Sequence, residues 1–452
     1  MSQNKRIIIS IFFIAVLSGV FWNQKMFGQP ISSDQLSYDG IAIDILNNGR
    51  FTDRGQPTFR EPGYPLFLAS IYKIFGHNYD AVRFIQIILF GLLAVFIYLL
   101  SRDIFGEKIA IFSSLGIALF YGLANQAGLI MTELLFTFLI CLFVYLIYKA
   151  SAEKGNKWLI FSALILGGAT LVRGMAEFLF FLVIINLFII FRGKISYKKI
   201  FYKVIIFTAC FFMVLMPWLV KTNFKNSVFI SSLTGHFLLL QTERMKELFP
   251  HYAGHFVGYS LGYYVSERLG FNTGSSSDKY TSYFENPIQS KTTELIAAGY
   301  DYSDINNIFI KEALPQIVEH PAQFLSVSIL NFFNFNSPIL IRGPLWQNTA
   351  ELFPQFADGR HPEISGYLKL IIVLIPRLLW FLFFFFVIKS IIKNFHDWGK
   401  IGWLILIVFY FNIIYSISSG LNRYALPIYP FYIMLAVVGA TYFYNRYVQK
   451  QK

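Results

Sequence analysis

Long apolar segments alternate with short polar loops along most of the chain. A transmembrane α-helix needs about 20 mostly apolar residues, and ten segments approach this length. The pattern therefore predicts an all-α polytopic membrane protein with about ten or more spans. The predicted spans are Ile7–Trp22, Ala81–Ser101, Ile109–Ala127, Leu134–Tyr148, Trp158–Val172, Phe178–Phe191, Val204–Val220, Leu368–Ile388, Ile401–Ile417 and Ala425–Tyr442. No small-residue cleavage pattern follows the first run, which predicts an uncleaved span rather than a signal peptide.

Lysine and arginine gather in loops that all fall on one side when the ten spans are threaded alternately through a membrane. These segments are 101–108, 149–157, 192–203, 389–400 and the C-terminal tail. Because loops rich in Lys and Arg stay in the cytoplasm, both termini are predicted to be cytoplasmic. The segments 24–80, 126–133, 173–177, 221–367 and 418–424 then lie on the outer face.

One apolar segment, 321–341, does not fit this orientation as a further span, so an interfacial or re-entrant helix is predicted there. It belongs to a long outer segment, 221–367, that mixes turn-rich and helical stretches. The pattern thus predicts three parts. They are an N-terminal membrane module over 1–220 with its first outer loop at 24–80, an outer domain over 221–367, and C-terminal spans over 368–452.

Composition agrees with a membrane protein and excludes other classes. Of 452 residues, 56% are hydrophobic and only 14% are charged, whereas soluble domains are about a quarter charged. The net charge of +13 comes from the interhelical loops, so it is interpreted as an orientation signal and not as a nucleic-acid-binding surface. Cys141 and Cys210 lie inside apolar runs, where neither a disulfide nor a metal site is expected.

The first outer loop begins with an amphipathic segment after Asp34. Tyr38, Ile41 and Ile45 fall on one predicted helix face, and Asp39 and Asp44 on the other. Gly49 suits the helix end because glycine tolerates left-handed geometry. The next apolar stretch, 62–76, is too short to span comfortably and is expected to dip into the protein.

Acidic and basic side chains concentrate in the same loop, including Asp34, Asp53, Arg54, Arg60 and Glu61. Cations can hold a phosphate while a carboxylate performs acid–base chemistry, so the mixture suits a negatively charged lipid headgroup as ligand. Two simpler explanations stay open on these residues alone. Each charge could be solvated surface, and Asp34 could cap the following helix.

Several segments in this order resemble the polyprenyl-phosphate-sugar-dependent glycosyltransferases of GT-C fold, which include protein O-mannosyltransferases and lipid A aminoarabinose transferases. In the N-terminal half these segments are "SSDQLSYDGIAIDILNNGRF", "FREPGYPLFLASIYKIFG", "TELLFTFLICLFV" and "TLVRG". Further along, the matching segments are "MPWLVKTNFKNSVFISSLTG" and "NRYALPIYPF". The resemblance covers the chain to about residue 240 and again near the C terminus, and it implies a GT-C-like bundle with an outer loop domain.

The resemblance also implies a catalytic carboxylate just past the first span, a place that Asp34 occupies. Asp34 would deprotonate the acceptor while polyprenyl phosphate leaves from the opposite face of the sugar, which gives inversion. Cations would neutralise the growing phosphate charge. The candidate phosphate-binding residues are Arg60, Arg173, Lys221 and Arg423.

Other residues are assigned supporting roles, namely Asp39, Glu61, Tyr64 and Glu133. Tyr64 and Trp218 also fit an aromatic belt at the membrane surface. Glu61 matches a Glu that helps to bind metal in aminoarabinose transferases, although the Lys that follows it there is replaced in this chain by Pro62. His236 is a second weak metal candidate, so a divalent metal stays possible and no cofactor is assigned.

The sequence therefore favours an inverting glycosyltransferase on the outer face of a bacterial cytoplasmic membrane. Its partners would be a polyprenyl-phosphate sugar donor, membrane lipid, and a lipid, glycan or protein acceptor, with no nucleic acid. A transporter or flippase of lipid-linked sugars is the first alternative, for which ionisable residues at mid-span would be expected. A polymerase or ligase of preassembled glycans is the second.

Overall fold

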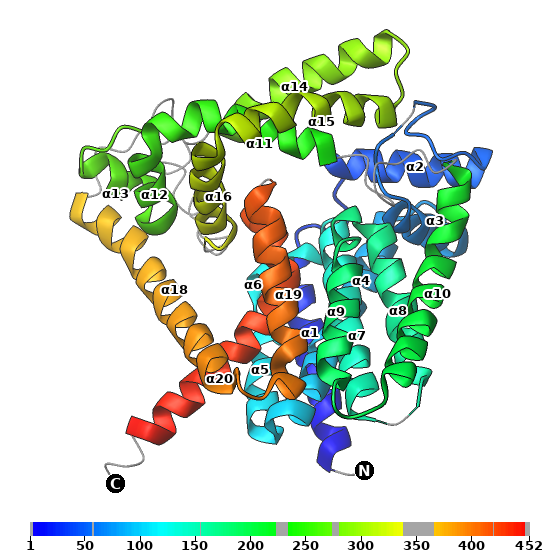
Figure 1. The fold of residues 1–452 in the computed structure, drawn as a ribbon, viewed down its shortest axis with the longest axis vertical. Coiled ribbons are helices and arrows are strands. Elements are labelled where there is room, and N and C mark those ends of the chain that lie inside the picture. The colour runs from blue at the N-terminus through cyan, green and yellow to red at the C-terminus, as the bar shows by residue number, and fades with distance from the viewer. Residues whose placement is uncertain are drawn as a thin grey trace. The chain divides into compact units, whose positions relative to one another are not determined.

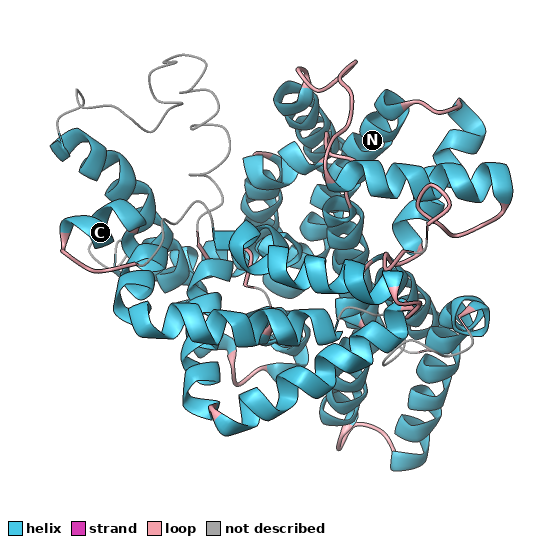
Figure 2. Ribbon diagram, turned by 90° about the horizontal axis from the view of Figure 1, so that it is seen from above, coloured by secondary structure: helices cyan, strands magenta, loops and turns pink. Residues whose placement is uncertain are grey.

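The computed structural model describes residues 3–56, 58–153, 155–222, 234–273, 280–337, 366–418 and 420–447. Within these ranges the regular structure is helical (Figure 2), apart from one isolated bridge between Asp53 and Gln56. This confirms the predicted all-α fold class. The stretch 223–233 belongs to one of the segments that resemble the glycosyltransferase family, and 338–341 belongs to the predicted interfacial helix. Both stretches lie outside the described residues.

In chain order, the described helices fall into one group before residue 223 and a second group after residue 233. The first group is α1 (Gln3–Asn23), α2 (Asp34–Asn48), α3 (Gly63–Phe75), α4 (Tyr79–Phe105), α5 (Glu107–Ala118), α6 (Tyr121–Gln126), α7 (Thr132–Ala152), α8 (Lys157–Val172), η1 (Gly174–Ala176), α9 (Leu179–Phe191) and α10 (Tyr197–Lys221). The second group is α11 (Thr234–Leu248), η2 (Phe249–His251), α12 (Tyr252–Leu261), α13 (Tyr263–Arg268), α14 (Tyr280–Ala297), α15 (Tyr302–Glu319), α16 (Pro321–Phe335), α18 (Gly366–Asn394), α19 (Trp398–Ile417), η6 (Asn422–Ile428) and α20 (Tyr429–Tyr447).

The chain divides into two compact units, and the helices α18 and α19 contribute to both. The first, named the bundle unit, comprises Met1–Ser231, Phe385–Tyr410 and Leu426–Lys452. The second unit comprises Ser232–Phe384 and Phe411–Ala425. The three-part functional division expected from the sequence stays a prediction.

Small residues allow the helices of the bundle unit to pack closely. Helix α4 packs against α1, α5 and α7, and α8 lies between α7 and α10 (Figure 1). Gly91 of α4 faces α1 so closely that an added Cβ would lie 2.8 Å from the ring of Phe12. Gly167 of α8 similarly approaches Val214 of α10, where a Cβ would lie at 2.9 Å. Such close contacts are typical of helices in membranes, where small residues let neighbouring backbones approach.

Eight helical segments among the described residues are long and apolar enough to cross a membrane. They are Asn4–Asn23, Tyr79–Phe105, Thr132–Ala152, Gly174–Phe191, Tyr197–Lys221, Leu374–Asn394, Trp398–Ile417 and Asn422–Arg446. Each corresponds to a predicted span. The chain is therefore an integral membrane protein, and the predicted orientation of its termini stays a prediction.

Two of the ten predicted spans differ from expectation. The run Ile109–Ala127 is not one helix, because Phe120 adopts extended backbone between α5 and α6. Phe120 stacks on Tyr429 of α20, with ring centroids 5.0 Å apart, and Tyr121 packs on Trp22 of α1. These contacts with distant segments hold Phe120 and Tyr121 at the point where the helix is interrupted. The other exception, α8, is apolar but has only 16 residues, about 24 Å of helix at 1.5 Å per residue.

The second unit has its own apolar core. Leu239, Leu240 and Met245 of α11 pack with Phe309 of α15 and Leu330 of α16. Helix α16 has 15 residues and begins at Pro321, where proline suits the first helical turn. The predicted helix in 321–341 is thus present over 321–335, and it is shorter than a span requires.

Candidate active site

Helix α2 carries the candidate carboxylate, and its two ends follow local sequence rules. It begins at Asp34, and the preceding Ser33 has φ of 54°, a conformation that residues other than glycine rarely adopt. It ends at Gly49, whose φ of 64° fits the predicted glycine end. Ser33 occupies the N-cap position and no side-chain cap hydrogen bond forms there, so the alternative that Asp34 caps the helix is not supported.

Asp34 pairs with Arg60 across the first outer loop. The Nη2 atom of Arg60 donates to Oδ1 of Asp34 at 2.8 Å, and 34% of the Asp34 side chain is exposed, against 18% for Arg60. A carboxylate offers about four acceptor positions, so this pair leaves Asp34 able to meet a further donor. The structure thus joins two residues that the sequence separates by 26 positions.

Tyr38 lies beneath Arg60 and holds the guanidinium in place. The Arg60 Nη1 atom donates to the Tyr38 hydroxyl at 3.2 Å, and its Cζ lies 4.6 Å from the centroid of the Tyr38 ring. Burial raises the pKa of Tyr38 to about 12, so the phenol stays protonated at neutral pH. The Nε–H of Arg60 is buried and has no hydrogen-bond partner among the described residues.

A second ion pair lies in the same cluster. The Nη2 atom of Arg173, just after α8, lies 3.5 Å from Oε1 of Glu133 in the first turn of α7. Both side chains are largely buried, with 14% and 2% exposed. A carboxylate also suits the N terminus of α7 because the helix dipole favours negative charge there.

Glu61 is hydrogen-bonded next to the second ion pair. Its Oε1 accepts a hydrogen bond of 3.1 Å from the backbone N–H of Gly174, next to Arg173. Four charged residues act electrostatically on the Tyr38 hydroxyl, namely Arg60, Glu61, Glu133 and Arg173. Asp34, Tyr38, Arg60, Glu61, Glu133 and Arg173 therefore form one group, named the charge cluster. The sequence placed Tyr38 only on an apolar helix face and did not predict that it belongs to the charge cluster.

A close backbone contact brings the cluster together. An added Cβ on Gly63, at the start of α3, would lie 2.7 Å from the backbone of Leu171 and Val172 at the end of α8. Only a residue without a side chain permits this approach. Since Arg60 and Glu61 precede Gly63 and Arg173 follows Val172, the contact sets the two arginine-bearing segments side by side.

Gly63→Ala is expected to destabilise the protein by about 1–3 kcal/mol, the usual cost of forcing extra atoms into packed structure. Backbone atoms cannot rotate away as a side chain can, so α3 must move from α8. Thermal unfolding in detergent measures the effect. Gly168→Ala on α8 is the matched control, because its added Cβ meets nothing within 4 Å. Equal melting temperatures for the two variants would contradict the close packing of α3 on α8.

Polar side chains of α2 and α4 form hydrogen bonds to the backbone of the loop before α7. The backbone N–H of Ile130 donates to Oε1 of Gln35 at 2.9 Å. Gln86 donates to the carbonyl oxygens of Ala127 and Leu129. Arg83 is 3% exposed and donates to Gly128 O and Gln29 O. The loop before α7 is therefore tied to both helices.

Asp39 is buried and lies away from the Asp34 carboxylate. Its carboxylate accepts from the hydroxyls of Tyr72 and Tyr79 at 2.8 and 3.2 Å, and lies 2.8 Å from Nε2 of His77. The helical pattern placed Asp39 on the polar face, but α3 and the 77–79 segment cover that face, and only 5% of the residue is exposed. Asp39 thus anchors α2 to α3 and the start of α4, and its supporting role in the site stays a prediction.

The other sequence candidates lie elsewhere. Tyr64 is fully buried and donates to Gln86 at 3.0 Å, so it belongs to the core under Tyr38 and not to a surface belt. Lys221 ends α10 beside the first outer loop, with Nζ 5.6 Å from the ring centroid of Phe51. Arg423 is exposed in η6, within the second unit.

The two metal candidates, His236 and Glu61, belong to different units of the chain. His236 belongs to α11 of the second unit, and burial lowers its pKa to about 4. Glu61 lies in the bundle unit with one carboxylate oxygen bound to a backbone N–H. Among the described residues, no group of three or more His, Cys, Asp or Glu is arranged to hold a metal ion.

Comparison with known proteins identifies the fold. A family described as dolichyl-phosphate-mannose-protein mannosyltransferase matches residues 56–220, which include four members of the charge cluster but begin after Asp34. An uncharacterized protein of Aquifex aeolicus is 31% identical over 171 residues, 36% of this chain and 34% of the relative. The match thus spans about a third of that relative.

Solved structures match over the whole chain. The oligosaccharyltransferase AglB from Archaeoglobus fulgidus, in complex with an inhibitory peptide and a dolichol-phosphate, has a TM-score of 0.54 and 13% identity, covering 100% of this chain and 52% of its own. The apo form of the Archaeoglobus fulgidus oligosaccharyltransferase has a TM-score of 0.52 and 11% identity, covering 98% and 51%. The chain thus spans about half the length of these proteins. It is an integral membrane protein with the GT-C fold of membrane glycosyltransferases, as the resemblance predicted.

Proposed function

We propose that the protein is a glycosyltransferase that moves a sugar from polyprenyl phosphate to a lipid, glycan or protein acceptor, with inversion at the anomeric carbon. The ion pair between Asp34 and Arg60 is the observation that carries this proposal. It places a carboxylate that can accept a proton beside a cation that can hold a phosphate. The GT-C fold and the partial mannosyltransferase match support the same chemistry.

The reaction needs only one displacement. The acceptor oxygen or nitrogen attacks the anomeric carbon, its proton passes to the Asp34 carboxylate, and the bond between that carbon and the phosphate oxygen breaks. Polyprenyl phosphate leaves with the bonding electrons. Because phosphate is already a good leaving group, the protein mainly positions both substrates, supplies the base and stabilises the growing negative charge.

Arg60 and Arg173 are the proposed phosphate ligands within the cluster. Arginine suits this task because its planar group bonds phosphate at two points. The unpartnered Nε–H of Arg60 is a donor that a phosphate oxygen would satisfy. Tyr38 and Glu133 would hold the two guanidinium groups in place before the donor binds. Lys221, which belongs to the same unit, is proposed as a further cation for this phosphate.

The structural neighbours support the substrate classes. AglB was solved with a dolichol-phosphate and a peptide, which supports a lipid-phosphate donor for this chain and makes a protein acceptor one of the candidates. Measuring the size of the transferred glycan would distinguish transfer of a single sugar from transfer of a preassembled oligosaccharide. The reaction is proposed to take place on the outer face of a bacterial cytoplasmic membrane.

Purified full-length protein in lipid vesicles tests this proposal with radiolabelled polyprenyl-phosphate sugars of known anomeric configuration. We expect labelled product only when both donor and acceptor are present. Nuclear magnetic resonance of the product should show the opposite anomer to that of the donor. Retention of configuration would contradict a single displacement. Donor translocation across the vesicle without transfer would favour the flippase alternative instead.

A further inference from the structure

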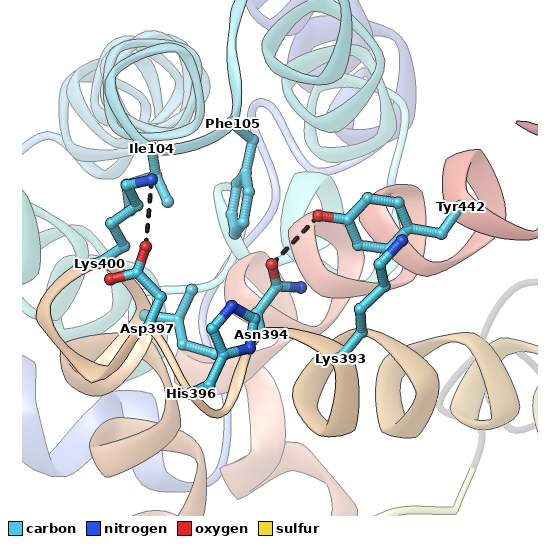
Figure 3. A pocket seen from close by; sticks show the side chains of 9 residues that line it. Ile104, Phe105, Lys393, Asn394, His396, Asp397, Lys400 and Tyr442 are labelled. Carbon is cyan, nitrogen blue, oxygen red and sulfur yellow. Dashed lines mark hydrogen bonds and ion pairs between the residues drawn. The ribbon is translucent and has the colours of Figure 1, made fainter.

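A basic pocket lies in the bundle unit at the far end of α4 from the charge cluster. Its volume is about 250 Å³, and Figure 3 shows its side chains converging from α4, α18, α19, α20 and the turn between α18 and α19. Helix α4 has 27 residues, about 40 Å at 1.5 Å per residue. The residues that define the basic pocket are Phe105, Lys393, Asn394, His396, Asp397, Lys400 and Tyr442.

The charge of this pocket is incompletely balanced. Lys400 pairs with Asp397 at 3.1 Å. Lys393 instead has its Nζ 3.7 Å from the centroid of the Tyr442 ring, which attracts the cation without cancelling its charge. Among the described residues, no carboxylate lies within ion-pair distance of Lys393. Two lysines against one aspartate leave the pocket with one positive charge when His396 is neutral.

The position of the pocket indicates where a balancing anion would come from. Four candidate spans meet there, because α4 and α18 end at Phe105 and Asn394, α19 begins at Trp398, and Tyr442 lies in the last turns of α20. The ends of spans lie at the membrane–water boundary, where lipid headgroups are found. A pocket of this volume holds roughly eight waters at about 30 Å³ each, enough for a phosphate with its ester groups.

Exposed apolar side chains neighbour Lys393 in the chain. Ile388 and Ile392 of α18, and Phe395 just after its end, are 54%, 69% and 57% exposed, and Ile388 and Ile392 directly precede Lys389 and Lys393 in the chain. A phosphate held by Lys393 would therefore place its attached acyl chains against an apolar surface. Soluble phosphates gain nothing from such a surface, whereas a phospholipid buries its chains there.

We propose that the basic pocket binds the phosphate of an anionic glycerophospholipid, with Lys393 and Lys400 as its cationic ligands. Basic pockets between transmembrane helices are a recurrent way to hold such headgroups. The bound lipid would bridge α4, α18 and α20 at the membrane surface opposite the candidate active site. This inference concerns binding and does not depend on the proposed transfer reaction.

Native mass spectrometry of the delipidated full-length protein tests it with dioctanoyl phosphatidylglycerol as the probe. A lysine near anionic lipid contributes about 1 kcal/mol, which is about fivefold in affinity, so Lys393→Gln with Lys400→Gln should weaken binding about 25-fold. Replacing both lysines with Arg should retain binding. Asp397→Asn should tighten it, because Asp397 is the one carboxylate among the described residues that line the pocket.

Matched controls distinguish lipid binding at this pocket from general attraction of the lipid to surface lysines. Lys198→Gln with Lys199→Gln removes two exposed lysines at the start of α10 and should leave the affinity unchanged. Dioctanoyl phosphatidylcholine should bind at least tenfold more weakly than phosphatidylglycerol. Equal loss in the two double variants, or equal binding of the two lipids, would overturn the proposal. Inorganic phosphate that competes at the same concentration as the lipid would overturn the assignment to a lipid.

Discussion

Asp34→Asn is expected to lower the rate of sugar transfer about a hundred- to ten-thousandfold, the usual contribution of a general base. The substituted amide has the same shape and can still accept the hydrogen bond from Arg60, but it cannot take a proton from the acceptor. Folding should therefore be preserved while the chemical step is lost. The rate constant for transfer at saturating donor and acceptor, measured in vesicles, gives the effect.

Asp103→Asn is the matched control for this variant. Asp103 is also a paired carboxylate, 2.8 Å from Lys149, but it lies near the other end of α4. Removing its charge should leave the transfer rate within about twofold of the starting protein, since Asp103 lies away from the charge cluster. A similar loss in both variants would mean that the effect of Asp34 is structural and not catalytic.

Arg60→Gln is expected to lower transfer about a hundred- to a thousandfold, the range seen when one donor that stabilises a developing negative charge is removed. It should also weaken donor binding, because the phosphate is present before and after the displacement. Arg60→Lys should recover only part of this loss. A lysine keeps the charge but lacks the planar group that reaches both Asp34 and Tyr38.

Arg54→Gln controls for the charge of the loop. Arg54 belongs to the same outer loop, and its Nη2 donates weakly, at 3.4 Å, to the carbonyl of Leu36. Its removal should leave donor binding within about twofold. If Arg54→Gln and Arg60→Gln weakened donor binding equally, general attraction of the phosphate to the loop would explain the result better than a defined site.

The sequence predicted the membrane bundle and part of the cluster because those features depend on composition and local pattern. Apolar length identified eight helices that can span a membrane. The glycine at position 49 marked the end of α2. The family resemblance pointed to Asp34, and a position near the predicted outer surface pointed to Arg60, Arg173, Lys221 and Arg423. The structure pairs Asp34 with Arg60.

Contacts between distant segments could not be derived in this way. Helical periodicity placed Tyr38 on an apolar face, which is correct for its ring but says nothing of the hydroxyl that meets Arg60. The same periodicity placed Asp39 toward water, because it does not show that Tyr72 and Tyr79 fold over that face. Gly63 carries no pattern that reveals the backbone of α8 beside it.

The interruption between α5 and α6 also depends on contacts between distant segments, so the sequence did not predict it. Hydropathy over 109–127 is continuous, and no proline interrupts it. The contacts of Phe120 with Tyr429 and of Tyr121 with Trp22 end the helix, and these partners are far away in sequence. Local propensity is a weak guide wherever tertiary packing decides the backbone.

Donor affinity and single-turnover transfer, measured on the same vesicles carrying Asp34→Asn, separate recognition of the lipid-linked sugar from its chemistry. If Asp34 takes the acceptor's proton, this variant binds donor within about threefold of the starting protein yet transfers at least a hundredfold more slowly. Transfer within about tenfold of the starting rate, with the fold intact, would contradict the role assigned to Asp34.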